Sequence, residues 1–220
     1  MTFQGFPDEG LVFYEGLEAD NSKTYWTRHR AAYDACVRAP MQALVDALAA
    51  EFGPGKLFRP YRDVRFSNDK TPYKTHQGAV AHQEGRGAGA CYVEISAEGL
   101  RVAGGAWRLE SDQVERYRRA VADDVQGPRL RAEVDRLAAA GWSIDGDRLT
   151  RVPKGYEVDD GRAGLLRHRS LHAGRLFEYA DWLHGPEALE RVRTSWRDLT
   201  ALNAWLADNV GATTKEVRRR

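Results

Sequence analysis

The side chains best suited to chemistry are concentrated in residues 59–76. This stretch has a surplus of three positive charges; its five cations are Arg59, Arg62, Arg65, Lys70 and Lys74, and its two acids are Asp63 and Asp69. Arginine presents a planar fork of N–H donors to a carboxylate or phosphate, and lysine presents a point charge. The composition of the stretch therefore predicts a site for an anion.

We expect this anion site to use two groups of side chains. Those that bind the anion are Arg62, Arg65, Lys70, Lys74 and Tyr73, and those that orient the arginines are Asp63 and Asp69. His76, at the end of the stretch, adds a group that titrates near neutral pH and could position a ligand or move a proton. No catalytic residue is assigned, because the sequence specifies no reaction.

A second basic segment covers residues 151–175. Its six cations are Arg151, Lys154, Arg162, Arg167, Arg169 and Arg175, and its three acids are Glu157, Asp159 and Asp160. We expect this segment to fold beside residues 62–74, so that both line one basic cleft. Lys154, Arg167 and Arg169 would form the second wall of that cleft.

Hydrophobic periodicity predicts helices on both sides of a strand-rich middle. The expected order is N-terminal helices over 10–52, a sheet-rich middle over 57–107, helices over 111–140, a hairpin and the basic segment over 142–175, and a C-terminal helix over 186–207. Asp20 or Asn21 is the expected cap of the second helix. The order predicts an α+β fold, one domain over residues 1–220, with an antiparallel or mixed central sheet on which the terminal helices pack.

The strand-rich middle sets three local expectations. Residues 57–66 are expected to form a strand, and residues 142–151 are expected to form a hairpin. The pair Gly104 and Gly105 predicts either a β-bulge or the close approach of another backbone.

Composition excludes several functional classes. With 33 Lys+Arg against 32 Asp+Glu the net charge is +1, which does not steer the chain toward nucleic acid or a membrane. No apolar stretch approaches the ~20 residues of a membrane helix, and no signal peptide begins the chain, so we expect a cytoplasmic protein. Cys36 and Cys91 are predicted to be buried free thiols. His168 and His172 lack the glutamate of a zinc-protease motif, and we expect no metal and no cofactor.

Four strings of the sequence together resemble one known family. They are residues 17–26, the string RDVRFSNDKTPYKT at residues 62–75, residues 104–107 and residues 153–156. On these strings the chain is identified as a member of a bacterial family of unknown function, domain of unknown function 2461. The family has no established activity, cofactor or catalytic residue, so the resemblance implies no reaction.

Three functions are consistent with these features. The first is a protein, with or without enzymatic activity, that binds a phosphate- or carboxylate-bearing small molecule. The second is a nucleic-acid or nucleotide-binding accessory factor in which Tyr61 or Tyr73 stacks on bases, a weaker hypothesis at near-zero net charge. The third is a structural or interaction module in which Arg62, Asp63 and Arg65 pair internally and no pocket forms. The sequence does not indicate an oligomeric state.

Overall fold

The computed structural model describes residues 2–65, 68–82, 87–156 and 160–215, and it has the expected α+β fold. Its helices are α1 (Asp8–Ala19), α2 (Lys23–Tyr33), α3 (Ala39–Phe52), α4 (Ser111–Ala122), α5 (Gln126–Ala139), α6 (Asp160–Leu166), α7 (Glu187–Asp198) and α8 (Thr200–Asn209). Its strands are β1 (Gly55–Leu57), β2 (His76–Ala81), β3 (Ala90–Ser96), β4 (Gly99–Ala106), β5 (Ser143–Asp145) and β6 (Leu171–Glu178).

These strands form a sheet in the order β1-β2-β3-β4-β6-β5. The two outer pairs are antiparallel; the partners are Gly55–Ala81, Lys56–Val80 and Leu57–Ala79 in β1–β2, and Ser143–Gly174, Ile144–Ala173 and Asp145–His172 in β5–β6. In β3 the alternating side chains Cys91, Val93 and Ile95 are buried, as the period-two pattern predicts for a strand with one face in the core.

Contacts divide the chain into two compact units, each built from three chain segments. The first unit contains Met1–Ala81, Tyr92–Val102 and Leu176–Ser195, and the second contains His82–Cys91, Ala103–Arg175 and Trp196–Arg220. The division falls within β3, β4 and β6, so these three strands contribute residues to both units. The expectation of a single domain stays a prediction.

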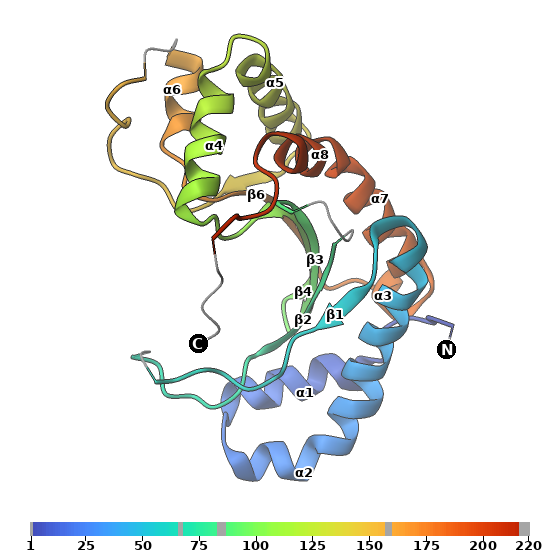
Figure 1. Ribbon diagram of the computed structural model, residues 1–220. Coiled ribbons are helices and arrows are strands. Elements are labelled where there is room, and N and C mark those ends of the chain that lie inside the picture. The colour runs from blue at the N-terminus through green and yellow to red at the C-terminus, as the bar shows by residue number, and fades with distance from the viewer. Residues whose placement is uncertain (1, 66–67, 83–86, 157–159, 216–220) are drawn as a thin grey trace. The chain divides into compact units, whose positions relative to one another are not determined.

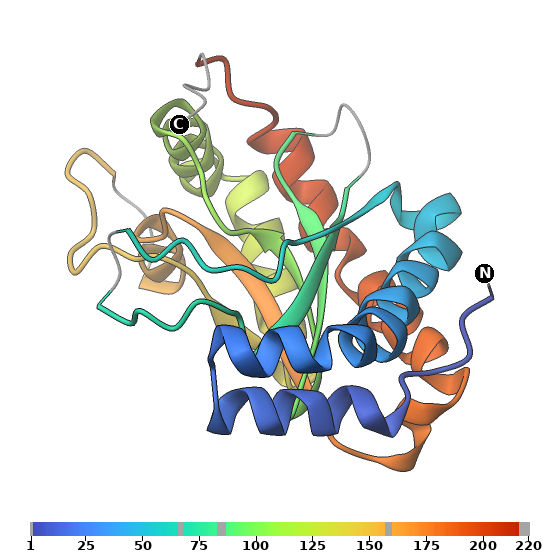
Figure 2. The same cartoon turned by 90° about the horizontal axis from the view of Figure 1, so that it is seen from below.

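The helices of the first unit follow the apolar periodicity of their sequence. Helices α1 and α2 lie side by side (Figure 1, Figure 2), and Phe13 of α1 contacts Trp26 and Tyr33 of α2. A π-helical turn, Asp34–Arg38, joins α2 to α3. Pro40 lies in the first turn of α3, directly after this π-helical turn, so the backbone stays helical through the junction although Pro40 offers no N–H.

The cap of α2 differs from the expected one. Ser22 is the N-cap, and its hydroxyl accepts a hydrogen bond of 3.1 Å from the backbone N–H of Tyr25. Asp20 instead follows the end of α1, and the side chain of Asn21 bonds to the backbone of Tyr73. The expected cap was wrong because a tertiary contact uses Asn21.

The strand expected over residues 57–66 was also wrong, because β1 ends where that strand was to begin. The following chain forms one isolated antiparallel bridge, between Tyr61 and Tyr73. Two backbone hydrogen bonds to the carbonyls of Pro60 and Pro72, of 2.8 and 2.9 Å, flank the bridge. Since proline has no N–H, these two residues accept but cannot donate, and a regular ladder does not continue.

In the second unit, residues 142–151 do not form the expected hairpin. Strand β5 pairs with the distant β6 instead, and a bridge between Arg148 and His168 continues that pairing. Strand β6 offers the buried side chains Leu171 and Ala173, so this pairing encloses apolar surface that a short local hairpin would leave in water.

Helices α4, α5, α6 and α8 make the rest of the second unit and pack on one another. The C-terminal helix expected over 186–207 is divided at Leu199 into α7 and α8. Gly105 has a φ of +133°, and a Cβ there would lie 2.4 Å from the carbonyl oxygen of Leu171. The close approach of another backbone, one of the two expectations for the glycine pair, is therefore what the structure contains.

Two further sequence expectations concern the thiols and the membrane. Cys36 and Cys91 are free, Cys91 is buried, and burial raises the pKa of its thiol to about 12. Within the described ranges, none of the helices has the length and apolar character required to cross a bilayer.

Candidate functional site

The segment with residues 60–74 is attached to the helices of the first unit through Tyr73. The Asn21 amide donates to the Tyr73 carbonyl and accepts from the Tyr73 N–H, both at 3.1 Å. The Tyr73 ring stacks on Trp26, with 4.4 Å between the ring centroids and 7° between the planes. Tyr73 was predicted to bind the anion, but it is only 5% exposed, and in this position it holds the segment in place.

Arg62 is fixed by two neighbours from the same segment. Its Nη1 donates to the carboxylate of Asp69 and to the hydroxyl of Thr71, the latter at 2.7 Å. Asp69 also accepts from the backbone N–H and the hydroxyl of Thr71, at 2.9 and 2.8 Å. These hydrogen bonds from Thr71, with the charge of Arg62, hold the pKa of Asp69 below its ordinary value. Asp69 and Thr71 thus set the direction of the Arg62 guanidinium.

Arg65 and Lys70 bond to their own segment. The Arg65 guanidinium donates to both carboxylate oxygens of Asp63, at 2.9 and 2.7 Å. The side-chain and backbone hydrogen bonds from Arg65 lower the pKa of Asp63 to about 2. Lys70 Nζ donates to the carbonyl of Val64 at 3.0 Å. Both cations therefore stabilise the shape of the segment.

A hollow of about 330 Å³ lies beside this segment; its lining comes from Arg62, Asp63, Lys74, Thr75 and His76. Lys74 extends over the ring of Phe58, with Nζ 5.3 Å from the ring centroid. Burial, and then the charge of Arg59, lowers the pKa of Lys74. Of the four cations predicted to bind the anion, the structure brings Arg62 and Lys74 together at this hollow, with His76 beside them.

The pKa of His76 is also below its ordinary value. Burial is the main cause, and the nearby charges of Lys74, Arg62 and Arg101 lower it further, while Glu94 opposes them. His76 Nε2 lies 3.7 Å from a carboxylate oxygen of Glu94. The imidazole is therefore neutral at pH 7 and carries one N–H donor and one acceptor nitrogen.

Sequence reasoning missed the residues behind His76. The Glu94 carboxylate accepts from Arg101 Nε at 3.1 Å and from the hydroxyl of Tyr92. Burial, and then Glu94, raises the pKa of Tyr92. Glu94 lies in β3 and Arg101 in β4, at equal distances from the turn that joins the two strands. Residues at such positions face each other across a hairpin, and this spacing was the signal in the sequence that could have identified the pair.

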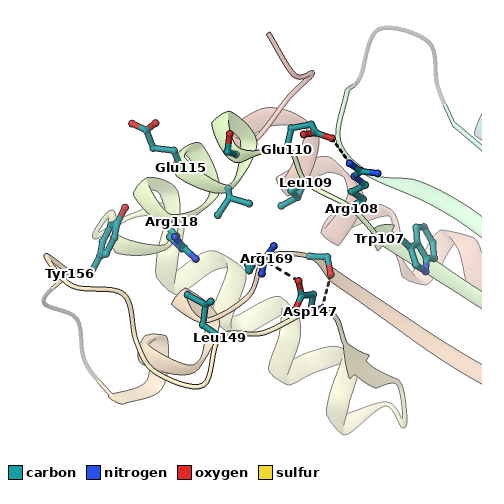
Figure 3. A pocket seen from close by; sticks show the side chains of 13 residues that line it. Trp107, Arg108, Leu109, Glu110, Glu115, Arg118, Asp147, Leu149, Tyr156 and Arg169 are labelled. Carbon is teal, nitrogen blue, oxygen red and sulfur yellow. Dashed lines mark hydrogen bonds and ion pairs between the residues drawn. The ribbon is translucent and has the colours of Figure 1, made fainter. Parts of the chain in front are cut away.

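The predicted second wall belongs to the second unit. Arg167 Nε donates to the carbonyl of Leu149 at 2.8 Å, and Lys154 lies in an exposed turn. Arg169 Nε lies 3.4 Å from the carboxylate of Asp147, and both side chains line a separate pocket of that unit (Figure 3). Residues 62–74 belong to the first unit, so the cleft shared by the two segments stays a prediction.

The described histidines, cysteines and carboxylates include no group of three or more arranged to hold a metal ion. His168 is buried, and its Nδ1 bonds to the carbonyl of Ser170 at 2.9 Å. His172 stacks on Trp107, with ring centroids 5.3 Å apart. Burial lowers the pKa of both histidines.

A comparison with protein families gives a match over most of the chain. The model of a family described as "Conserved hypothetical protein (DUF2461)" matches residues 9–205. The chain belongs to the DUF2461 family. A search of curated proteins found no match for this DUF2461 chain.

The four strings that resemble DUF2461 fall into two pairs, one in each unit. The first string supplies Asn21 and Trp26, and both contact Tyr73 of the long central string. Trp107 and Tyr156, from the two remaining strings, line the same pocket of the second unit. Each unit of this DUF2461 member therefore holds one pair of the strings.

Proposed function

We propose that this protein binds a small molecule bearing a phosphate or carboxylate group in the hollow of the first unit. Arg62 and Lys74 bind the anionic group directly, and His76 donates a ring N–H. Arg65, Lys70 and Tyr73 support the segment that carries Arg62 and Lys74. Arg62 and Lys74 are among the residues that the sequence predicted to bind the anion, and His76 was predicted to position a ligand or move a proton.

The observation that carries the proposal is the positive charge gathered around Lys74. Lys74 forms no ion pair with any other described residue, and its pKa is lowered by burial and by Arg59. Lys74 and Arg62 in turn lower the pKa of His76. Because these like charges share a partly buried hollow, an anion placed among them would interact more strongly than in open solvent.

The internal pairs of the segment favour a second candidate, a purely structural role. Arg65 pairs with Asp63 and Arg62 with Asp69, which fixes the segment without any ligand. Exposed pairs of this kind add little stability by themselves. In this second candidate Lys74 serves no ligand, and its charge is dispensable.

Two matched lysine variants separate these candidates. Lys74→Met keeps the apolar stem that lies over Phe58 and removes the charge, and Lys70→Met removes the charge of a lysine that does not line the hollow. We expect a thermal-shift screen of inorganic phosphate, phosphate esters and carboxylates to give a stabilising anion for the wild type. Lys74→Met should bind it at least about tenfold more weakly, since a charged hydrogen bond contributes about 1.5–3 kcal/mol.

The Lys70→Met variant should bind the anion more tightly than Lys74→Met does, because Lys70 supports the segment but does not line the hollow. Equal affinities of the two variants would contradict the assignment of Lys74. A wild-type protein that no anion of the screen stabilises would favour the structural role.

A further inference from the structure

A large pocket lies wholly within the second unit and is lined by none of the residues of the proposed function. It encloses about 810 Å³, and residues before and along α4, the loop around Asp147, Tyr156 and the chain at Arg169 line it (Figure 3). Pockets that hold organic ligands usually enclose about 300–1,000 Å³. The space therefore suits a ligand with an organic body.

The acidic side chains that line this pocket each have an arginine partner. Glu110 pairs with Arg108 at 3.2 Å, and Asp147 lies 3.4 Å from Arg169. The third acid, Glu115, pairs at 3.0 Å with Arg119, which does not line the pocket. Each of these three carboxylates is thus paired with an arginine other than Arg118.

Arg118 is the lining cation that remains. It forms no ion pair or hydrogen bond with the other described residues, and its Nε is buried without a hydrogen-bond partner. In Figure 3 Arg118 projects from α4 into the pocket, Arg169 is turned toward Asp147, and Glu115 points away from the pocket. A carboxylate or phosphate oxygen in that space would pair with the charge of this guanidinium, the Arg118 side chain, which none of the other described residues neutralises.

The remaining walls suit an apolar body attached to such an anion. Leu109, Val114 and Leu149 line the pocket, and Trp107 and Tyr156 add two aromatic rings. Trp107 is 40% exposed, and its stacking on the half-buried His172 fixes its orientation. Aromatic walls bury much area at low entropic cost and stack on planar groups.

We infer that this pocket is a second ligand site, which takes a carboxylate or phosphate on an aromatic or apolar body. Arg118 binds the anionic group, with Arg169 beside it, and Trp107 and Leu149 contact the body. This site shares no residue with the hollow of the first unit, so either site can exist without the other.

Four probes test this inference by isothermal titration on the full chain. Two of them carry an anionic group on a naphthyl ring: 2-naphthoate carries a carboxylate, and 1-naphthyl phosphate carries a phosphate. The other two are controls: 2-naphthol is the uncharged aromatic body, and inorganic phosphate is an anion without an organic body. We expect at least one of the two naphthyl anions to bind at least tenfold more tightly than both 2-naphthol and inorganic phosphate. Which of the two binds more tightly identifies the anionic group.

The matched variants are Arg118→Gln and Arg119→Gln, neighbours on α4. Arg119 is 70% exposed and paired with Glu115, so its variant controls for the loss of one charge from the helix. Arg118→Gln should weaken the binding of the naphthyl anion at least tenfold, Arg118→Lys should weaken it less, and Arg119→Gln should leave it unchanged. Far-UV circular dichroism shows whether each variant is folded.

Two results would overturn the inference: equal weakening in the Arg118→Gln and Arg119→Gln proteins, or no binding of either naphthyl anion to the wild type. If Arg118→Gln fails to fold, the comparison of Arg118→Lys with Arg119→Gln decides in the same way. Lys74→Met should bind the naphthyl anion as the wild type does, which keeps this test separate from that of the proposed function.

Discussion

At the scale of single residues, His76 reports the charge of the hollow. Its pKa is lowered first by burial and then by Lys74, Arg62 and Arg101, while Glu94 raises it. Each of these neighbours can be neutralised separately, so their opposite effects on one imidazole can be measured.

We expect Lys74→Met to raise the pKa of His76 toward 6.5, the ordinary value for histidine, because a positive neighbour that opposes protonation is removed. Glu94→Gln should lower it further, since the carboxylate favours the charged imidazole. Proton NMR titration of the His76 ring, assigned with a His76→Gln protein, measures both shifts. Shifts of the same sign in the two variants would contradict the charge arrangement described for the hollow.

At the scale of elements, one amide connects the start of α2 to the central segment. Asn21 makes two hydrogen bonds with the backbone of Tyr73, and Asp20 beside it is exposed. We expect Asn21→Ala to lower the free energy of unfolding by about 1–3 kcal/mol, at about 0.5–1.5 kcal/mol for each bond. Asn21→Asp, which keeps only an acceptor, should lose less, and Asp20→Ala should lose little.

Urea unfolding followed by circular dichroism measures these differences. If Asp20→Ala is as destabilising as Asn21→Ala, the loss of stability comes from a change in the connection between α1 and α2. It would then not come from the hydrogen bonds of Asn21 with Tyr73.

The elements also divide into those that the sequence predicts and those it does not. Amphipathic helices and the alternating strand β3 carry their burial pattern in their own residues, and β3 forms where it was expected. Strand β5 could not be assigned in this way, because its partner β6 begins 26 residues after it ends, at Leu171. The same limit applies to the cap of α2, since nothing local indicates that Asn21 serves Tyr73.

The candidate site shows the same division on a smaller scale. Composition predicts that residues 59–76 are cationic and turn-rich, and it names Arg62 and Lys74 among the residues that bind the anion. The pairing of Arg65 with Asp63 was only one of the alternatives that the sequence left open. That Lys70 bonds to a backbone carbonyl was not predicted, because this contact depends on the path of an irregular loop.

For the whole molecule, three imidazoles that are buried or half-buried contribute to the pH dependence of stability. The pKa values of His76, His168 and His172 are all lowered, chiefly by burial. Below pH 6.5 the unfolded chain therefore binds more protons at these residues than the folded protein does, so stability falls as the pH falls through the lowered values. Carboxylates with lowered pKa, such as Asp63, act in a separate window, below about pH 4.

We expect the urea midpoint to be lower at pH 5.5 than at pH 7.5, with an unchanged slope if the transition stays two-state. A His168→Gln protein should show a smaller difference between the two pH values. A midpoint that is constant or rises on acidification would contradict the lowered pKa values.

The first residues of the chain are tied to residues near its end. The N–H of Phe6 bonds to the carbonyl of Leu183, and the Phe6 carbonyl bonds to His184 Nδ1, both at 2.8 Å. A nascent chain leaving the ribosome therefore cannot complete its N-terminal layer until residue 184 has been synthesised. At about 5–20 residues per second this takes about 10–40 s. During that time the backbone of Phe6 lacks both of its hydrogen-bond partners, Leu183 and His184.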